Sequence, residues 1–145
     1  MREKRLVTIA RRARAMGSAR GDTMALRAGR SLEENLEELV KHFPVDERGY
    51  SGTKGVSRRE WIRNIATEAP GRTAAEFAAM AAANPSVVRP LPDKGFVWIM
   101  RDGSKVTYRW TSTSDGTPVV ELSCNGVLGI ADQKIHFVPS RKGKR

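Results

Sequence analysis

The sequence predicts an α+β domain in which N-terminal helices pack on a four-stranded antiparallel β-sheet. Up to about residue 85, apolar residues recur at helical spacing behind three Ser/Thr-x-x-Glu sequences, a pattern typical of helix starts. From Ser86 onward, apolar and polar residues alternate, and Asp-Gly turns separate the alternating runs. Because helices followed by an antiparallel meander define the α+β class, these two observations set the fold prediction.

The first half of the chain is predicted to be helical, with one glycine-rich break. The predicted segments are a basic helix at Met1–Gly17, a loop at 17–30, a capped helix at Leu32–His42, a connector at 43–56, a capped helix from Ser57 to about Ala69, and an Ala-rich helix at Phe77–Ala83. Pro70-Gly71 is expected to end the second of the capped helices, and Thr73 to cap the third. The connector divides a helical N-terminal region, residues 1–43, from the domain predicted at 57–139.

The second half is predicted to form the sheet, and residues 140–145 a basic tail. The expected strands are a short one at 87–89, then Phe96–Met100, Lys105–Trp110, Pro118–Cys124 and Gln133–Val138. In the third of these, alternation places Val106 and Tyr108 on one face and Thr107 and Arg109 on the other.

The charge balance indicates an anionic partner. The chain of 145 residues holds 26 Lys and Arg against 16 Asp and Glu, a net charge of +10. Nucleic acid is the first candidate, ahead of an anionic membrane surface, an acidic protein, or a basic surface that serves solubility alone. No apolar run is long enough to span a bilayer and no secretory signal is present, so no membrane anchor is expected. Cys124 is the only cysteine, which leaves no internal disulfide and no Cys/His zinc site to expect.

Polar groups suited to phosphate chemistry fall on one face of the predicted sheet. If the strands pair in register, that face gathers Lys105, Thr107, Arg109, Glu121, Lys134 and His136. Cleavage of RNA without a metal needs a base for the ribose 2′-OH, an acid for the leaving 5′-oxygen, and cations that stabilise the crowded phosphate. This face offers all three kinds of group, and no cofactor is required.

Each polar residue has an expected role. His136 is the acid or base, and Arg109 and Lys134 stabilise the charge of the phosphorane. Glu121 is either the complementary base or an ion-pair partner of Arg109. The expected substrate contacts are Lys105 and the hydroxyls of Thr107, Thr111, Ser112 and Ser114, with Tyr50 as the base-stacking residue. The three tryptophans, Trp61, Trp98 and Trp110, are expected in the core rather than in a stacking site.

Between about Ser86 and Val138, the chain resembles the C-terminal toxin domains of bacterial polymorphic toxins. Such domains are found on contact-dependent inhibition and Rhs proteins, and they are similar to the barnase/EndoU/colicin/RelE group of ribonucleases. The resemblance rests on four segments in matching order: Gly95–Trp98, Asp102–Arg109, Ser112–Val120 and Gln133–Phe137. Within them, Arg109, Ser114, Lys134 and His136 match polar positions of the family pattern.

The resemblance implies a RelE/barnase-like ribonuclease fold and metal-independent cleavage of tRNA or mRNA. It also implies a cognate acidic immunity protein or antitoxin, and action in the bacterial cytoplasm of a target cell. The chain departs from the pattern at its start, because a toxin tip usually ends a long polypeptide, whereas this sequence opens with Met1 and a basic segment. The delivery route is therefore left open.

Three other functions compete with the ribonuclease. One is an interaction or DNA-binding protein that would use the N-terminal helices, although no clear recognition-helix signature is present there. A non-catalytic RNA-binding module needs the basic face but not His136. A metal-dependent nuclease would use Asp93 and Glu121 as a carboxylate pair, although Ser123 stands where that pattern expects a lysine.

Overall fold

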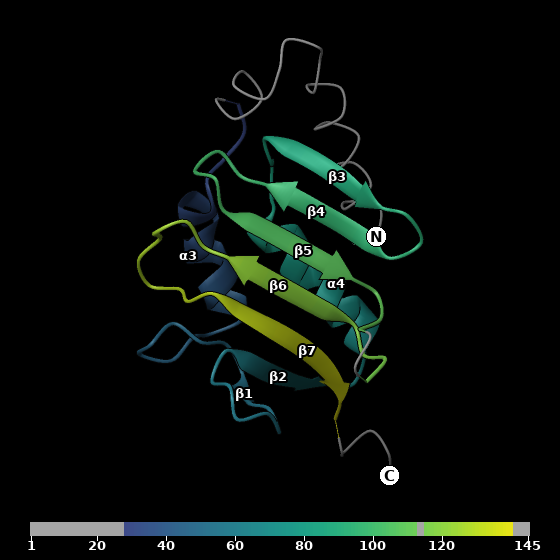
Figure 1. Ribbon diagram of the computed structural model, residues 1–145. Coiled ribbons are helices and arrows are strands. Elements are labelled where there is room, and N and C mark those ends of the chain that lie inside the picture. The colour runs from purple at the N-terminus through teal and green to yellow at the C-terminus, as the bar shows by residue number, and fades with distance from the viewer. Residues whose placement is uncertain (1–27, 113–114, 141–145) are drawn as a thin grey trace.

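The computed structural model describes residues 28–112 and 115–140, which form a seven-stranded mixed sheet with two helices (Figure 1). The elements are α3 Leu32–His42, β1 Thr53–Lys54, β2 Ile62–Thr67, α4 Pro70–Ala81, β3 Val87–Leu91, β4 Gly95–Ile99, β5 Lys105–Arg109, β6 Val119–Ser123 and β7 Gln133–Pro139. The basic helix expected at Met1–Gly17, most of the loop at 17–30 and most of the basic tail lie outside the described residues.

The strand order is β1-β2-β7-β6-β5-β4-β3, so the prediction of a four-stranded antiparallel sheet is wrong. The meander from β3 to β7 is antiparallel throughout, as the alternation and turns predict. Two strands that the sequence did not reveal, β1 and β2, extend the sheet beyond β7. Because β2 pairs with β7 in parallel, the sheet is mixed.

The largest error concerns β2, which falls inside the helix predicted from Ser57 to about Ala69. The Ser-x-x-Glu sequence that suggested a helix start forms only a local turn, in which the Ser57 hydroxyl accepts a hydrogen bond from the Arg59 N–H at 3.1 Å. The spacing of Ile62 and Ile65 also fits the apolar stripe of a helix, but the backbone of residues 62–67 pairs with β7. The apolar spacing of this segment is compatible with a helix and with a strand, and the pairing with β7 selects the strand.

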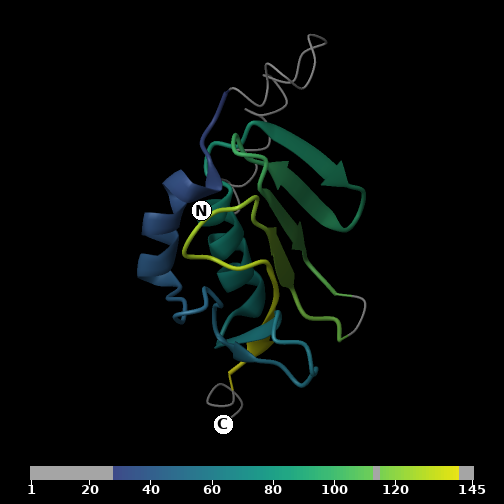
Figure 2. The same cartoon turned by 60° about the vertical axis from the view of Figure 1, so that its left-hand side comes forward.

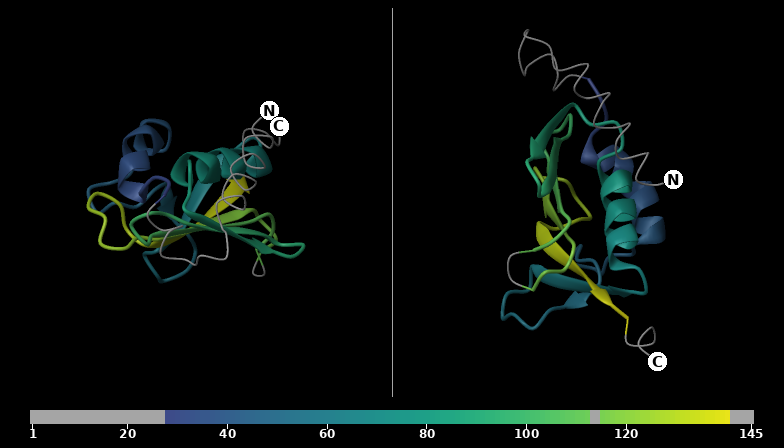
Figure 3. Two further views of the ribbon diagram at one scale, coloured as in Figure 1. Left: turned by 90° about the horizontal axis from the view of Figure 1, so that it is seen from above. Right: turned by 90° about the vertical axis from the view of Figure 1, so that its right-hand side faces the viewer.

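Both helices lie on one face of the sheet (Figures 2 and 3). The capping box predicted for α3 is present, since Ser31 and Glu34 exchange hydrogen bonds between side chain and backbone. The other helix begins earlier than predicted: Pro70 does not end a helix but opens α4, because a proline in the first turn loses no intrahelical hydrogen bond. Neither helix in the described part of the chain has the length and apolar character needed to cross a bilayer.

The core fills the space between α4 and the sheet. Phe77 of α4, Trp98 of β4 and Phe137 of β7 are fully buried, and the rings of Phe77 and Phe137 meet edge to face with centroids 5.8 Å apart. Burying each such side chain contributes about 1.5–3 kcal/mol to folding. Asn35 of α3 donates to the Ala81 and Ala83 carbonyls at the end of α4, which ties the two helices together.

Candidate functional site

The pairing register places all six residues of the expected polar set on the sheet face that points away from the helices. Thr107 pairs with Glu121 and Glu121 with Lys134, while Arg109 and His136 both pair with Val119. The alternate residues of β7, Ile135 and Phe137, belong to the core under the helices. We refer to the face that carries Lys105, Thr107, Arg109, Glu121, Lys134 and His136 as the open face.

Exposure differs along the open face. Lys105 is exposed, whereas Thr107, Arg109, Glu121 and Lys134 are half-buried. The Arg109 and Glu121 side chains approach to 3.8 Å, so the ion pair is one of the two roles that the sequence left open for Glu121. Each side chain of this pair is about two fifths exposed, so solvent screens the pair and it contributes little to stability.

His136 is the exception on this face, because only 5% of the residue is exposed. The turn between β5 and β6, in which the Ser112 N–H donates to the Thr117 carbonyl at 2.7 Å, contacts its imidazole. Imidazole Nδ1 lies 2.9 Å from Thr117 Oγ1 and 3.3 Å from Asp115 Oδ1. The turn therefore brings a carboxylate and a hydroxyl to the same nitrogen.

The hydrogen-bond directions fix the tautomer of neutral His136. Thr117 donates its only hydroxyl proton to Asp115 Oδ1 at 2.7 Å, so its oxygen is left to accept from imidazole Nδ1. Nδ1 then carries the proton, and the lone pair of the neutral ring is on Nε2. An imidazole held in this way presents Nε2 as its basic nitrogen, which is the arrangement a general base needs.

Asp115 stays ionised over the whole physiological range. Partial burial of the carboxyl opposes ionisation, but hydrogen bonds from Ser112 and Thr117 and the nearby His136 outweigh it and lower the pKa of Asp115 to about 2. The Ser112 hydroxyl donates to this carboxylate at 2.5 Å. Asp115 is thus a fixed negative charge 3.3 Å from His136 Nδ1.

The remaining hydroxyls predicted to contact substrate, and the carboxylates of the rival nuclease, do not form one cluster in the described part of the chain. Ser112 is buried and engaged with Asp115, so it positions a side chain rather than facing solvent, while Thr111 is exposed beside it. Ser114 lies outside the described residues. Of the carboxylates considered for a metal-dependent nuclease, Asp93 is in the β3–β4 turn and Glu121 in β6, with β5 between them.

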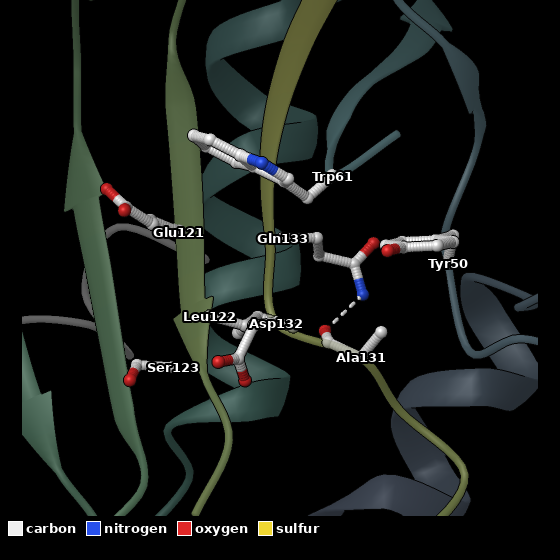
Figure 4. Close-up of a pocket in the computed structure, with 8 residues that line it drawn as sticks. All are labelled: Tyr50, Trp61, Glu121, Leu122, Ser123, Ala131, Asp132 and Gln133. Carbon is white, nitrogen blue, oxygen red and sulfur yellow. Dashed lines mark hydrogen bonds between the residues drawn. The ribbon is translucent and has the colours of Figure 1, made fainter. Parts of the chain in front are cut away.

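A pocket of about 420 Å³ opens near the start of β7 (Figure 4). Its lining residues are Tyr50, Trp61, Glu121, Leu122, Ser123, Ala131, Asp132 and Gln133. The Trp61 indole lies across β7 toward β6, on the side of the sheet away from α4 (Figure 4). The pocket therefore shares Glu121 with the open face and extends that face beyond the polar set.

Sequence reasoning missed Asp115, Thr117 and Trp61. Asp115-Gly116 was interpreted only as a turn, although an Asp with a Ser three residues before it and a Thr two residues after it is a sequence-visible sign of a hydrogen-bonded carboxylate. Trp61 is 39% exposed rather than in the core. Its position depends on the unpredicted strand β2, so no local signal would have revealed it.

Comparison with known proteins adds no identification. No family model, no curated protein and no solved structure matches this chain.

Proposed function

We propose that this protein is a metal-independent endoribonuclease that cuts tRNA or mRNA in the bacterial cytoplasm and leaves a 2′,3′-cyclic phosphate. The observation that carries the proposal is the oriented pair of Asp115 and His136 at one end of a face that also holds Lys134 and Arg109. A net charge of +10 supports an anionic polymer as substrate and an acidic immunity protein or antitoxin as the neutralising partner.

The reaction needs no group beyond those on the open face. The ribose 2′-oxygen attacks the adjacent phosphorus and the bond from phosphorus to the 5′-oxygen breaks. The 2′,3′-cyclic phosphate therefore remains on the nucleotide at the 5′ side of the cut, and the next nucleotide leaves with a 5′-hydroxyl. One group removes the proton of the 2′-OH and another gives a proton to the 5′-oxygen. His136 and Glu121 are the two groups that transfer these protons, and the cations stabilise the phosphorane.

Lys134 and Arg109 flank the imidazole at different spacings. Lys134 is two residues from His136 on the same face of β7, about 7 Å along the strand. Arg109 lies two strands away in the same register row, about 10 Å between backbones. Both side chains are long enough to converge on a phosphate placed beside His136, and Arg109 offers a two-pronged contact.

Low exposure of His136 favours a second candidate, RNA binding without cleavage. In that function the hydrogen bonds among His136, Thr117 and Asp115 serve to fasten the β5–β6 turn to β7, and the cations of the open face bind the RNA backbone.

The decisive experiment incubates the purified protein with total RNA and a chelator, then examines the new 3′ ends for 2′,3′-cyclic phosphate. We expect cleavage by the native protein and a loss of at least about a hundredfold in His136→Ala, since general acid–base catalysis contributes that much. His42→Ala, an exposed histidine on α3, is the matched control and should cleave normally. RNA that is bound by both variants but cut by neither, nor by the native protein, would establish the binding function instead.

A further inference from the structure

The pocket at the start of β7 is held in shape by two buried polar side chains. Gln133, 2% exposed, accepts from the Ser51 N–H at 2.7 Å and donates to the Gly49 and Ala131 carbonyls. Arg63, 4% exposed, donates to the Ser51 and Gly52 carbonyls at 3.0 Å each. The wall that carries Tyr50 is therefore fixed to β2 and β7 before any ligand arrives, which lowers the entropy cost of binding.

Trp61 is the aromatic surface of this pocket that remains open. It is 39% exposed, and one guanidinium group, that of Arg59, lies over its ring at 5.5 Å from the centroid, whereas two such groups lie over Tyr50. Tyr50 is less available, because the guanidinium groups of Arg48 and Arg63 lie over its ring at 5.4 and 4.9 Å. A planar ligand would therefore stack on Trp61 rather than on Tyr50.

The polar groups of the pocket are mainly acceptors. Glu121 and Asp132 each contribute a carboxylate to the pocket. Asp132 Oδ1 accepts a hydrogen bond from the Cys124 N–H at 2.7 Å. Carboxylates repel a phosphate but accept hydrogen bonds from N–H donors. In a chain with a net charge of +10, this pocket thus suits the uncharged, donor-bearing part of a nucleic acid rather than its backbone.

We propose that the pocket holds one unpaired RNA base, stacked on Trp61, whose exocyclic amino group donates to the Asp132 carboxylate. Adenine, cytosine and guanine carry such a group, whereas uracil presents carbonyl oxygens on both sides of its single N–H and is disfavoured. This inference rests on the proposed function and assigns a base subsite to it. Asp132, at the pocket, lies four residues from His136, about 13 Å along β7, so the base belongs to a nucleotide other than the one at the imidazole.

The test measures binding of short 2′-O-methyl oligonucleotides, which cannot be cleaved because the attacking hydroxyl is blocked. One is all uridine, and three others carry a single central adenosine, cytidine or guanosine. We expect the native protein to bind the amino-bearing oligonucleotides about tenfold more tightly than the uridine one. Fluorescence anisotropy at fixed salt gives the four dissociation constants.

Three variants examine the two contacts separately. Trp61→Ala should weaken binding of every oligonucleotide by about tenfold, while Trp61→Phe, which keeps an aromatic face, should retain most of the affinity. Trp110→Ala is the matched control, since this tryptophan is 42% exposed on another part of the sheet. Asp132→Asn should remove the preference for amino-bearing bases. Because Asp132 also accepts the Cys124 N–H, the ratio of affinities is the measure rather than the affinity itself.

The outcomes separate this inference from the proposed cleavage. Equal affinity for all four oligonucleotides, or a Trp61→Ala variant that folds normally and binds as Trp110→Ala does, would overturn the base subsite. A base preference lost in Asp132→Asn, in a protein that cuts no RNA, would support the subsite while refuting the ribonuclease.

Discussion

Asp115 and Thr117 decide the state of His136 at the scale of single residues. Thr117 gives its proton to the carboxylate and accepts from imidazole Nδ1, so two short side chains set both the tautomer and the orientation of the ring. The carboxylate itself is held by Ser112 and by the Thr117 N–H. The chemistry of His136 is thus determined by the β5–β6 turn rather than by its own strand.

The first prediction concerns the pH dependence of stability through Asp115. Its pKa in the folded protein, about 2, is below its ordinary value of 3.8, so its contribution to stability is fully present above the ordinary value and is lost as the pH falls toward the folded value. Native protein and Asp115→Asn should therefore differ in free energy of unfolding at about pH 5, and this difference should shrink through about pH 3. Urea titrations at the two pH values measure it.

The control for this prediction is Asp93→Asn, a carboxylate in the β3–β4 turn. Its free energy of unfolding is compared with that of the native protein at the same two pH values. A difference for Asp115→Asn that grows as the pH falls would show that the carboxylate is not stabilised in its ionised form.

At the scale of elements, the same Ser-x-x-Glu sequence has two outcomes. Behind Ser31 it caps α3, with the Glu34 N–H donating to the Ser31 hydroxyl at 3.0 Å. Behind Ser57 it forms a turn that leads into β2. The difference follows from the element that each segment contacts. The helix α3 packs on α4, whereas the segment after Ser57 pairs with the edge of β7.

The second prediction tests this difference with a matched pair of variants. Ser31→Ala removes a helix cap and should lower the free energy of unfolding by about 1 kcal/mol. Ser57→Ala changes the same residue type in the same sequence pattern but removes no cap, so it should stay within about 0.5 kcal/mol of the native protein. Urea denaturation followed by circular dichroism measures both. Losses of equal size would mean that Ser57 also caps a helix in solution.

At the scale of the whole molecule, charge and architecture act together. The sheet turns its apolar face to α4 and leaves the open face with three cations, Lys105, Arg109 and Lys134. The helix on the other side, α3, carries acidic groups such as Glu37, which pairs with Lys41 at 3.9 Å. The described part of the chain thus offers one face to an anionic polymer rather than a uniform positive surface.

The third prediction is the salt dependence of RNA binding. If Lys134 contacts a phosphate, Lys134→Ala should flatten the slope of log affinity against log salt by about 0.7, the value expected for one lost contact with single-stranded RNA. Lys41→Ala removes an equal charge on α3 and should leave the slope unchanged. Anisotropy titrations at several salt concentrations give both slopes, and equal effects of the two variants would exclude a localised interface.

The sequence predicts the second half of this fold much better than the first. Alternation and Asp-Gly turns locate β4 to β7 within a residue or two, because those signals are local and only one structure satisfies them. The segment from Ser57 to Ala69 was predicted wrongly, because its apolar spacing suits both a helix and a strand. Long-range pairing with β7 selects the strand, and no local rule contains that information.

The open face follows from strand alternation alone: a period of two places Lys134 and His136 on one side of β7, and Arg109 and Thr107 on one side of β5. The contact of His136 with Asp115 of the β5–β6 turn, and the pocket that Trp61 and Glu121 line together, depend on how the chain folds in space. Alternation is a property of each strand alone. A contact between a turn and a strand, or between strands far apart in the chain, exists only once the sheet has closed.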